Sequence, residues 1–537
     1  MKKLQRISIY DTTLRDGAQA EGISFSLASK IRVARRLDDL GIDYVEGGYP
    51  GSNQKDMAFF EELQRQPLRH AQLVAFGSTR RANLQSSADA NLVRLLEAGT
   101  PVVTIFGKSW KLHVDDVLRT TVAENLAMIR DSVRFLKEGG RTVFFDAEHF
   151  FDGYKDSATF ALDALRAAVE AGADAVMLCD TNGGTLPHDV YRITKEVVRD
   201  FPVPVGIHAH NDAEMGVANS LEAVRAGAVY VQGTINGYGE RCGNANLCSI
   251  IPSLELKLGF GCVGEGRLHE MRDVSLLVDE TVNMRHNTRA PYVGDSAFGH
   301  KGGMHVNAVE KNPRTFEHVP PESVGNQRRI LISENSGSSS ILLKAMELGV
   351  RMDRSSPELR EVLSLLKELE GKGYAFEAAD ASLKILIQKV LREHKAFFDL
   401  ESFRVIVEKR GKDQPCLSEA TIKLRVNNEV EQTVADGDGP VNALDQALRK
   451  ALMRFYPQIA QVALTDFRVR IVDPEVATAA RTRVLIESSD GEETWGTVGV
   501  SENIIEASWQ ALLDSVEYKL FREEEKAQAA GAEPGSV

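Results

Sequence analysis

The first half of the chain alternates short apolar runs with longer amphipathic segments. Each run is rich in β-branched or aromatic residues and leads into polar or glycine residues, and each longer segment has helical periodicity. The runs cover residues 7–11, 43–48, 72–77, 102–107, 142–149, 175–183, 203–212 and 230–240. Repeated strand and helix signals of this kind predict an α/β fold, a (β/α)8 TIM barrel over residues 1–275.

A doubly wound open sheet also alternates strands with helices and is the main alternative. The barrel is favoured because nearly every apolar run ends in polar residues that can do chemistry. All strand ends of a barrel converge on one mouth, whereas an open sheet concentrates its site at one switch point.

The pattern changes after the barrel. Residues 276–398 combine an irregular stretch, 290–313, with helical segments and are expected to form helical linker subdomains. Residues 399–522 carry a weak repeat of strand, turn and helix, which predicts an α+β domain of two βαβ-like units. Such a domain suits effector binding or dimerisation, and two α+β layers without a ligand are the alternative. The small and polar residues of 523–537 are expected to be disordered.

Composition limits the classes of function. The chain has 537 residues, of which 43% are hydrophobic and 26% charged, and its formal net charge is −13. No basic stripe is found, which argues against a nucleic-acid partner. The five cysteines are scattered, as in proteins with reduced thiols, and no run is long enough to span a membrane. We expect a cytoplasmic protein with neither a membrane nor a nucleic-acid partner.

The strongest local signal is the pair His208 and His210 in the seventh run. Residues two apart on a strand point to the same face, so both imidazoles can reach one ion. Asp16 follows the first run, which lies close to the seventh and eighth in a closed barrel. Asn244, after the eighth run, offers an amide oxygen. This set suits Mg²⁺, Mn²⁺ or Zn²⁺ and does not choose among them.

Other strand ends carry groups suited to acid–base or anion chemistry. Arg15 precedes Asp16, and Gly17 would let the chain turn so that both charges serve one place. A fixed cation beside a metal can stabilise an oxygen that gains negative charge. Glu148 ends the fifth run and is an acid–base candidate. Thr181 either donates a hydrogen bond to a substrate carboxylate or caps a helix.

Some residues are explained at least as well by structure alone. His305 lies in GHKGGMH, outside the barrel, and taken by itself a structural role is favoured. Phe76, Phe106 and Phe145 lie near strand ends and could narrow an acceptor pocket, but core packing is favoured for each.

Seven motifs in a fixed order are more specific than any one of them. They are YDTTLRDGAQ, EGGYPGSN, DAEHFFDGY, CDTNGG, HAHND, GYGERCGN and GHKGGMHVNAV. Together they resemble the metal-dependent Claisen condensation family that contains the 2-isopropylmalate, homocitrate and citramalate synthases. The resemblance covers about residues 5 to 520 and includes the family's C-terminal regulatory domain. The first three motifs are most similar to the branch that condenses acetyl-CoA with pyruvate.

The resemblance implies an acyltransferase that joins acetyl-CoA to pyruvate and then hydrolyses the thioester, as an entry to isoleucine synthesis. The site residues it implies are Arg15, Glu148 and His305 for catalysis, Arg15, Thr181 and Gln19 for the substrate, and Asp16, His208, His210 and Asn244 for the divalent metal. It also implies a homodimer, in which the linker with His305 and Tyr374 lies over the partner's barrel, and isoleucine as the effector.

Three alternatives stay open. The chain could condense acetyl-CoA with another 2-oxo acid, as 2-isopropylmalate synthase and homocitrate synthase do, or cleave a 3-hydroxy acid as an acyl-CoA lyase or aldolase. A barrel without catalysis could instead serve as an amino-acid sensor. A regulatory domain fits biosynthesis better than degradation, and the presence of all the candidate metal ligands argues against the sensor.

Overall fold

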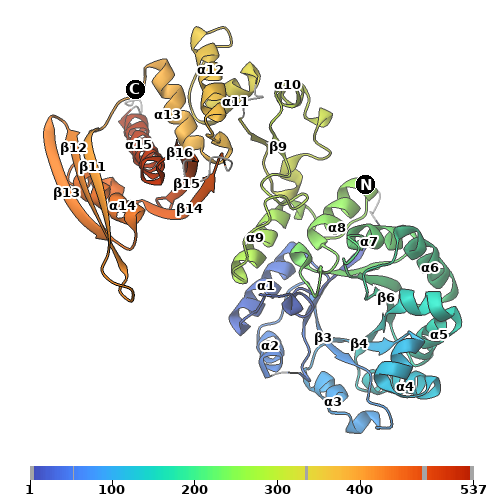
Figure 1. Ribbon diagram of the computed structural model, residues 1–537. Helices are drawn as coiled ribbons and strands as arrows, with labels where there is room; N and C mark the ends of the chain where they lie inside the picture. The colour runs from blue at the N-terminus through green and yellow to red at the C-terminus, as the bar shows by residue number, and fades with distance from the viewer. Residues whose placement is uncertain (1–4, 53, 333–336, 474–479, 532–537) are drawn as a thin grey trace, which may run out of the picture. The chain divides into compact units, whose positions relative to one another are not determined.

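The computed structural model describes residues 5–52, 54–332, 337–473 and 480–531 (Figure 1). Two compact units are formed. The first holds the described residues up to Phe298 together with Glu317–Arg328, and the second holds Gly299–Phe316 and the described residues from Arg329 onwards.

Eight parallel strands of the first unit close into a barrel in chain order. They are β1 (Ser8–Asp11), β2 (Tyr44–Gly48), β3 (Gln72–Ser78), β4 (Val102–Lys108), β5 (Thr142–Glu148), β6 (Ala175–Asp180), β7 (Val205–Ala209) and β8 (Tyr230–Gly233). β8 pairs in parallel with β1, with Tyr230 opposite Ser8, and this pairing closes the ring. The predicted TIM barrel is confirmed, and each apolar run contains one strand.

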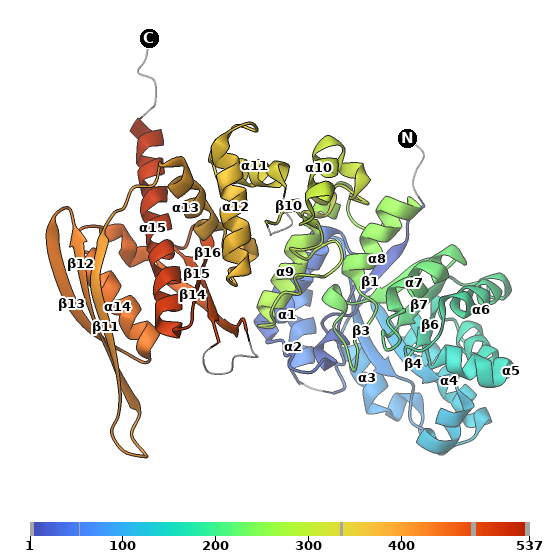
Figure 2. The same ribbon diagram turned by 45° about the horizontal axis from the view of Figure 1, so that its top comes forward.

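A helix follows each strand, and the helices surround the barrel (Figures 1 and 2). They are α1 (Leu27–Leu40), α2 (Gln54–Arg65), α3 (Ala90–Glu97), α4 (Val122–Glu138), α5 (Phe150–Glu170), α6 (Pro187–Asp200), α7 (Gly216–Arg225) and α8 (Leu247–Ser253). Another helix, α9 (Met271–Thr281), packs against α1. Because α9 crosses residue 275, the first unit extends past the boundary that the sequence pattern indicated.

The inside of the barrel has an apolar end and a polar end. Aromatic rings fill the end where the strands begin, and the ring centroid of Tyr44 lies 5.3 Å from that of Phe144 and 5.8 Å from that of Tyr230. Nearer the carboxyl ends of the strands, buried polar side chains such as Glu46 and Gln232 replace them. The larger apolar core lies between the strands and the surrounding helices.

Helices form the first part of the second unit. They are α10 (Gly303–Lys311), α11 (Ser338–Glu347), α12 (Pro357–Gly371) and α13 (Asp380–Leu391), and the short strands β9 (Gly299–His300) and β10 (Arg329–Ile330) pair beside them. The stretch 290–313 had little periodicity, yet α10 forms within it. Only Val306 and Val309 of α10 are buried, so the helix leaves a weak apolar pattern.

Two three-stranded antiparallel sheets follow, each with a helix packed against it (Figure 2). The first copy is β11 (Asp399–Lys409), β12 (Cys416–Val426), β13 (Glu429–Gly437) and α14 (Pro440–Leu452), and the second is β14 (Ala463–Ile471), β15 (Thr482–Ser489), β16 (Thr494–Ser501) and α15 (Ile504–Gly531). The repeat is therefore βββα, and the expected βαβ-like unit was wrong. The sequence pattern did not reveal β13, because few of its residues are buried and its apolar signal is weak. The strand also follows the tight turn Asn427–Asn428, where both residues have positive φ.

The last helix, α15, continues through residues 523–531, so the expected disorder from residue 523 was wrong for this segment. Residues 532–537 lie outside the described residues. Charged side chains hold the end of the helix in place, since Lys384 on α13 binds the Glu525 carboxylate at 2.6 Å and Lys519 binds Glu523 at 2.7 Å. Among the described helices, none has the length and apolar character needed to cross a bilayer.

Candidate functional site

The turn after β1 sets Arg15 and Asp16 side by side at the mouth of the barrel. The Asp11 carboxylate accepts hydrogen bonds from the backbone N–H and the hydroxyl of Thr13, at 2.9 and 2.8 Å. Gly17 has no positive φ, and a Cβ at this position would make only ordinary contacts. The backbone N–H groups of Arg15 and Asp16 bond to the carbonyl of Thr12, at 3.1 and 2.8 Å, and close the turn. The turn therefore does not depend on the conformational freedom of glycine, and the expected role of Gly17 was wrong.

Asp16, His208 and His210 come together at this mouth. All three are buried, and one candidate ligand atom of each lies within 4.8 Å of the others. Nε2 of His208 is 3.2 Å from an oxygen of Asp16 and 3.3 Å from Nε2 of His210. Two imidazole nitrogens and a carboxylate that converge in this way fit a divalent metal ion.

The surroundings shift the pKa of each of the three residues, and for Asp16 and His210 the shift favours the protonation state that binds metal. Burial alone would raise the pKa of Asp16, but Arg15 and His208 lower it, and the net shift is downward. Burial and then His208 lower the pKa of His210 to about 3, which keeps its ring neutral. Burial alone would lower the pKa of His208, but Asp16 outweighs it and raises the pKa. An ion that binds Nε2 of His208 therefore competes with a proton.

Asn244 lies against this cluster, with its amide nitrogen facing the other residues. Nδ2 donates a hydrogen bond to Asp16 at 2.8 Å, whereas Oδ1 is buried and has no hydrogen-bond partner among the described residues. For Oδ1 of Asn244 to be the predicted metal ligand, the amide group must rotate by half a turn, so that Oδ1 and Nδ2 exchange places. After that exchange Oδ1 would face the Asp16 carboxylate, which cannot donate a hydrogen bond, so a bound cation would be needed to give the oxygen a partner.

The guanidinium of Arg15 is held by two carboxylates and a ring. Nε donates to the Glu46 carboxylate at 2.5 Å, Nη1 lies 3.0 Å from Asp16, and Cζ lies 3.7 Å from the centroid of Phe76. Burial alone would lower the pKa of Arg15, but Asp16 and Glu46 raise it. These contacts use only part of the five N–H donors of the side chain and leave others for a ligand.

Glu46 on β2 was not predicted from the sequence. Its side chain is 0% exposed, and its second oxygen accepts a hydrogen bond from the hydroxyl of Tyr10 at 2.5 Å. A carboxylate inside the barrel is costly unless it is paired, and Arg15 supplies the opposite charge. The available signal was an acidic residue within the otherwise apolar run DYVEGG.

A cavity of about 210 Å³ lies beside the cluster. The predicted residues that line it are Arg15, Asp16, Gln19, Glu148, Thr181, His208 and His210, and the others are Phe76, Phe106, Asp146, Cys179, Glu240 and Arg241. The rings of Phe76 and Phe106 stack with centroids 5.5 Å apart. Phe76 and Phe106 thus line the cavity, and Phe76 is also buried, whereas Phe145 packs in the core outside the cavity.

Two further predicted residues have informative partners. The Glu148 carboxylate forms a short ion pair with Lys108 at the end of β4, which the sequence did not single out. Thr181 Oγ1 accepts a hydrogen bond from the backbone N–H of His149 at 2.9 Å, so its own proton is left to donate. Thr181 does not cap α6, because that helix begins at Pro187 after Leu186.

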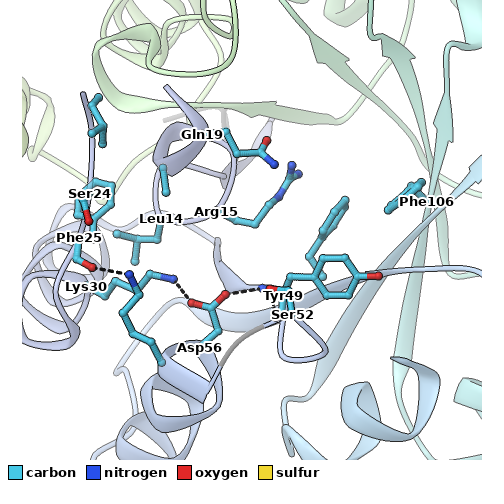
Figure 3. Close-up of a pocket in the computed structure, with 14 residues that line it drawn as sticks. Leu14, Arg15, Gln19, Ser24, Phe25, Lys30, Tyr49, Ser52, Asp56 and Phe106 are labelled. Atoms are coloured by element: carbon cyan, nitrogen blue, oxygen red, sulfur yellow. Dashed lines mark hydrogen bonds and ion pairs between the residues drawn. The ribbon is translucent and has the colours of Figure 1, made fainter. Parts of the chain in front are cut away.

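A second cavity, of about 470 Å³, adjoins the first (Figure 3). Both cavities are lined by Arg15, Gln19, Phe76 and Phe106. The remaining walls of the second cavity are Leu14, Ala18, Ile23, Ser24, Phe25, Lys30, Tyr49, Ser52, Lys55 and Asp56. Figure 3 shows Arg15 and Gln19 on one side of this cavity. The mouth thus offers a small polar chamber next to a larger, mostly apolar one.

His305 is on α10 in the second unit, where its exposed ring stacks on Phe316 with centroids 4.1 Å apart. Tyr374 also lies in that unit, and its hydroxyl donates to Gln510 at 2.9 Å. The catalytic role of His305 stays a prediction.

Three family models match successive parts of the chain. The HMGL-like model matches residues 6–278, the homocitrate synthase post-HMGL domain-like model residues 292–373, and the LeuA allosteric (dimerisation) domain residues 377–520. The HMGL-like match alone covers more than half of the chain and coincides with the barrel. HMGL-like enzymes depend on a divalent metal, which agrees with the cluster of Asp16, His208 and His210.

Full-length relatives agree with these models. The chain is 54% identical to an (R)-citramalate synthase of Geobacter sulfurreducens over 97% of this chain and 98% of the relative. It is also 54% identical to an (R)-citramalate synthase of Aquifex aeolicus, over 97% and 99% of the two chains. A 2-isopropylmalate synthase of Methanocaldococcus jannaschii is more distant, at 29% identity over 97% and 96%. The chain therefore belongs to the HMGL-like family and, within it, to the family of the (R)-citramalate synthases.

Proposed function

We propose that this protein is an (R)-citramalate synthase, an acyltransferase that condenses acetyl-CoA with pyruvate and hydrolyses the thioester to citramalate and CoA. The observation that carries the proposal is the cluster of Asp16, His208 and His210 with Arg15 at its side, in a chain 54% identical to enzymes of that name. We propose that the enzyme works in the cytoplasm and catalyses the entry step of isoleucine synthesis.

The smaller cavity is proposed to hold the 2-oxo acid. When bound at the cluster, a divalent ion supplies Lewis acidity toward the keto and carboxylate oxygens, and Mg²⁺, Mn²⁺ and Zn²⁺ all suit the donor set. Arg15 directs N–H donors at the keto oxygen as that oxygen becomes negative. Thr181 donates its free hydroxyl proton to the carboxylate, and the stacked rings of Phe76 and Phe106 narrow the space left for the acceptor's side chain.

The adjoining cavity is proposed to take the acetyl thioester. Its apolar walls suit the uncharged arm of CoA, and the wall it shares with the smaller cavity would place the acetyl group beside the keto carbon. Glu148 is proposed to take part in moving the proton of the acetyl methyl group, with Lys108 fixing its carboxylate. His305 and Gln19 keep the acid–base and substrate roles that the family resemblance implies.

Release of free thiol tests the reaction and the acceptor together. The protein with acetyl-CoA and Mg²⁺, Mn²⁺ or Zn²⁺ is given pyruvate, 2-oxobutyrate, 2-oxoisovalerate or 2-oxoglutarate. We expect the highest kcat/KM with pyruvate, and citramalate as the product. No thiol release with pyruvate would refute the proposal. Preference for 2-oxoisovalerate or 2-oxoglutarate would favour the 2-isopropylmalate or homocitrate reaction, and release of acetyl-CoA or pyruvate from a 3-hydroxy acid would favour a lyase.

The C-terminal domain is proposed to form a homodimer and to bind isoleucine. β11 and β14 carry apolar side chains that are exposed in a single chain, among them Val407 at 53%, Val469 at 44% and Ile471 at 57%. A second copy of the chain would cover such strands. Light scattering should then give twice the chain mass of 59.0 kDa, and isoleucine but not leucine should inhibit thiol release. A monomeric, isoleucine-insensitive protein would refute both parts.

Replacing Gly239 with alanine is expected to weaken metal binding and activity at least about tenfold. Disturbing a residue that contacts and orients the metal ligands typically costs about 10- to 100-fold in affinity or activity. A Cβ at Gly239 would lie 1.8 Å from Oδ1 of Asn244, so the amide would be pushed from its place beside Asp16. The apparent activation constant for Mn²⁺ in the thiol assay measures the effect. Gly184→Ala is the matched control, since a Cβ there meets nothing within 4 Å. Equal behaviour of the two variants would contradict a role for Asn244.

A further inference from the structure

Gln232 lies inside the barrel on β8 and connects two residues of the site. Its side chain is 0% exposed. Oε1 lies 2.7 Å from Nδ1 of His208, and Nε2 donates a hydrogen bond to Oδ1 of Asp146 at 3.1 Å. The amide thus bridges β7 and β5 on the inner side of the His208 ring, away from Asp16 and His210.

The amide of Gln232 lies with its NH₂ group toward Asp146, which accepts the hydrogen bond, and with its carbonyl oxygen toward His208. A carbonyl oxygen only accepts hydrogen bonds, so Nδ1 of His208 carries the proton in this arrangement. The nitrogen of His208 that can give up its proton is therefore Nε2, which lies 3.2 Å from Asp16 and 3.3 Å from His210.

The two histidines of the cluster differ in this respect. Nδ1 of His210 is buried and has no hydrogen-bond partner among the described residues. The ring of His208, by contrast, is held at both nitrogens, by Gln232 on one side and by Asp16 on the other. A ring held at its remote nitrogen keeps one tautomer and one orientation, and this typically strengthens a metal ligand.

We propose that Gln232 is a positioning residue that holds His208 in the Nδ1–H tautomer and so sets the affinity of the site for a divalent ion. Gln232 would act only through His208 and would touch neither substrate nor metal. The inference rests on the proposed function, because it takes His208 to be a metal ligand.

Two substitutions separate this role from a purely structural one. Gln232→Met keeps the length of the side chain but removes the acceptor. Gln232→Glu keeps an acceptor for Nδ1 of His208, and the contact with Asp146 is kept when the two carboxyl groups share one proton. Mn²⁺ is titrated into the metal-free protein, and electron paramagnetic resonance monitors the decrease of the free-ion signal as the ion binds. This titration gives the dissociation constant for Mn²⁺ without any catalysis. Gln64→Met is the control, since Gln64 lies on α2 and donates to the carbonyl of Ala98, outside the barrel.

The methionine variant is expected to bind Mn²⁺ about 10- to 100-fold more weakly, the usual effect of losing a hydrogen bond to a ligating histidine. The Mn²⁺ affinity of the glutamate variant and of the Gln64→Met control should stay within about threefold of that of the unmodified protein, well below the loss expected for the methionine variant. Saturating Mn²⁺ should restore most of the kcat of the methionine variant, because the lesion is in metal affinity and not in the chemical step.

Unchanged Mn²⁺ affinity in Gln232→Met would overturn the proposal. A loss in Gln232→Glu as large as in Gln232→Met would overturn it too, since the acceptor would then not matter. The glutamate variant keeps the proposal testable if the methionine variant does not fold. If the unmodified protein itself binds no Mn²⁺, the proposed metal site fails, and the role of Gln232 fails with it.

Discussion

Asp16→Asn should lower kcat/KM by about a thousandfold and weaken metal binding strongly. The substitution removes the carboxylate from a cluster whose other members are two imidazoles, so the charge that attracts a divalent ion is lost. Lewis acidity supplies several kcal/mol to such a reaction, and about 1.4 kcal/mol corresponds to a factor of ten in rate. Thiol release and Mn²⁺ binding measure the two effects.

Removal of the ion gives a parallel test on the unmodified protein. Treatment with a chelator should abolish thiol release, and Mn²⁺ or Mg²⁺ should restore it. Asp152→Asn is a suitable control for the loss of one carboxylate near the mouth, because Asp152 contacts Asn182 at 2.9 Å and does not belong to the metal cluster. Unchanged Mn²⁺ affinity in Asp16→Asn would exclude Asp16 as a ligand.

Arg15→Lys should lower kcat by about 100- to 1000-fold, the size seen when one group that stabilises an oxyanion is removed. Lysine keeps the charge but has a single ammonium group, which cannot contact Glu46, Asp16 and a substrate oxygen together as the planar guanidinium can. The KM for acetyl-CoA should change much less than kcat, because the interaction grows as the oxygen becomes negative.

Two further variants decide whether the effect of Arg15→Lys is specific. Arg80→Lys changes another buried arginine, one that pairs with Glu124 at 2.7 Å and Asp131 at 2.8 Å, and it should leave kcat nearly unchanged. Glu46→Gln should itself lower kcat, and its effect should not add to that of Arg15→Lys because the two residues act through one contact. Additive effects would show that Glu46 does not act by holding Arg15.

Much of the barrel could be predicted from local pattern. Its parallel strands are buried on both faces, so each appears in the sequence as a short continuous apolar run. The pair His208 and His210 was recognisable because alternate residues of a strand share a face. The C-terminal sheets were harder, because strands such as β14 are largely exposed in one chain and lack that apolar signal.

Partners across the barrel could not be predicted in the same way. Glu46 and Gln232 are single polar residues in apolar runs, and their meaning depends on Arg15 and His208, which lie 31 and 24 positions away in the chain. The orientation of Asn244 likewise depends on Asp16, 228 positions away. The periodicity of the sequence cannot predict contacts between residues so far apart in the chain. These contacts depend on which strands become neighbours when the sheet closes.

The sequence by itself determined the eight strands, the shared face of the two histidines and the choice of metal-binding chemistry, because these depend on residues near one another in the chain. Only the tertiary structure decided that Glu46 holds Arg15 and that Gln232 contacts His208. The physical reason is burial. A polar group enclosed in the barrel must be paired with whatever the fold places beside it, and closure of β8 onto β1 brings those groups together.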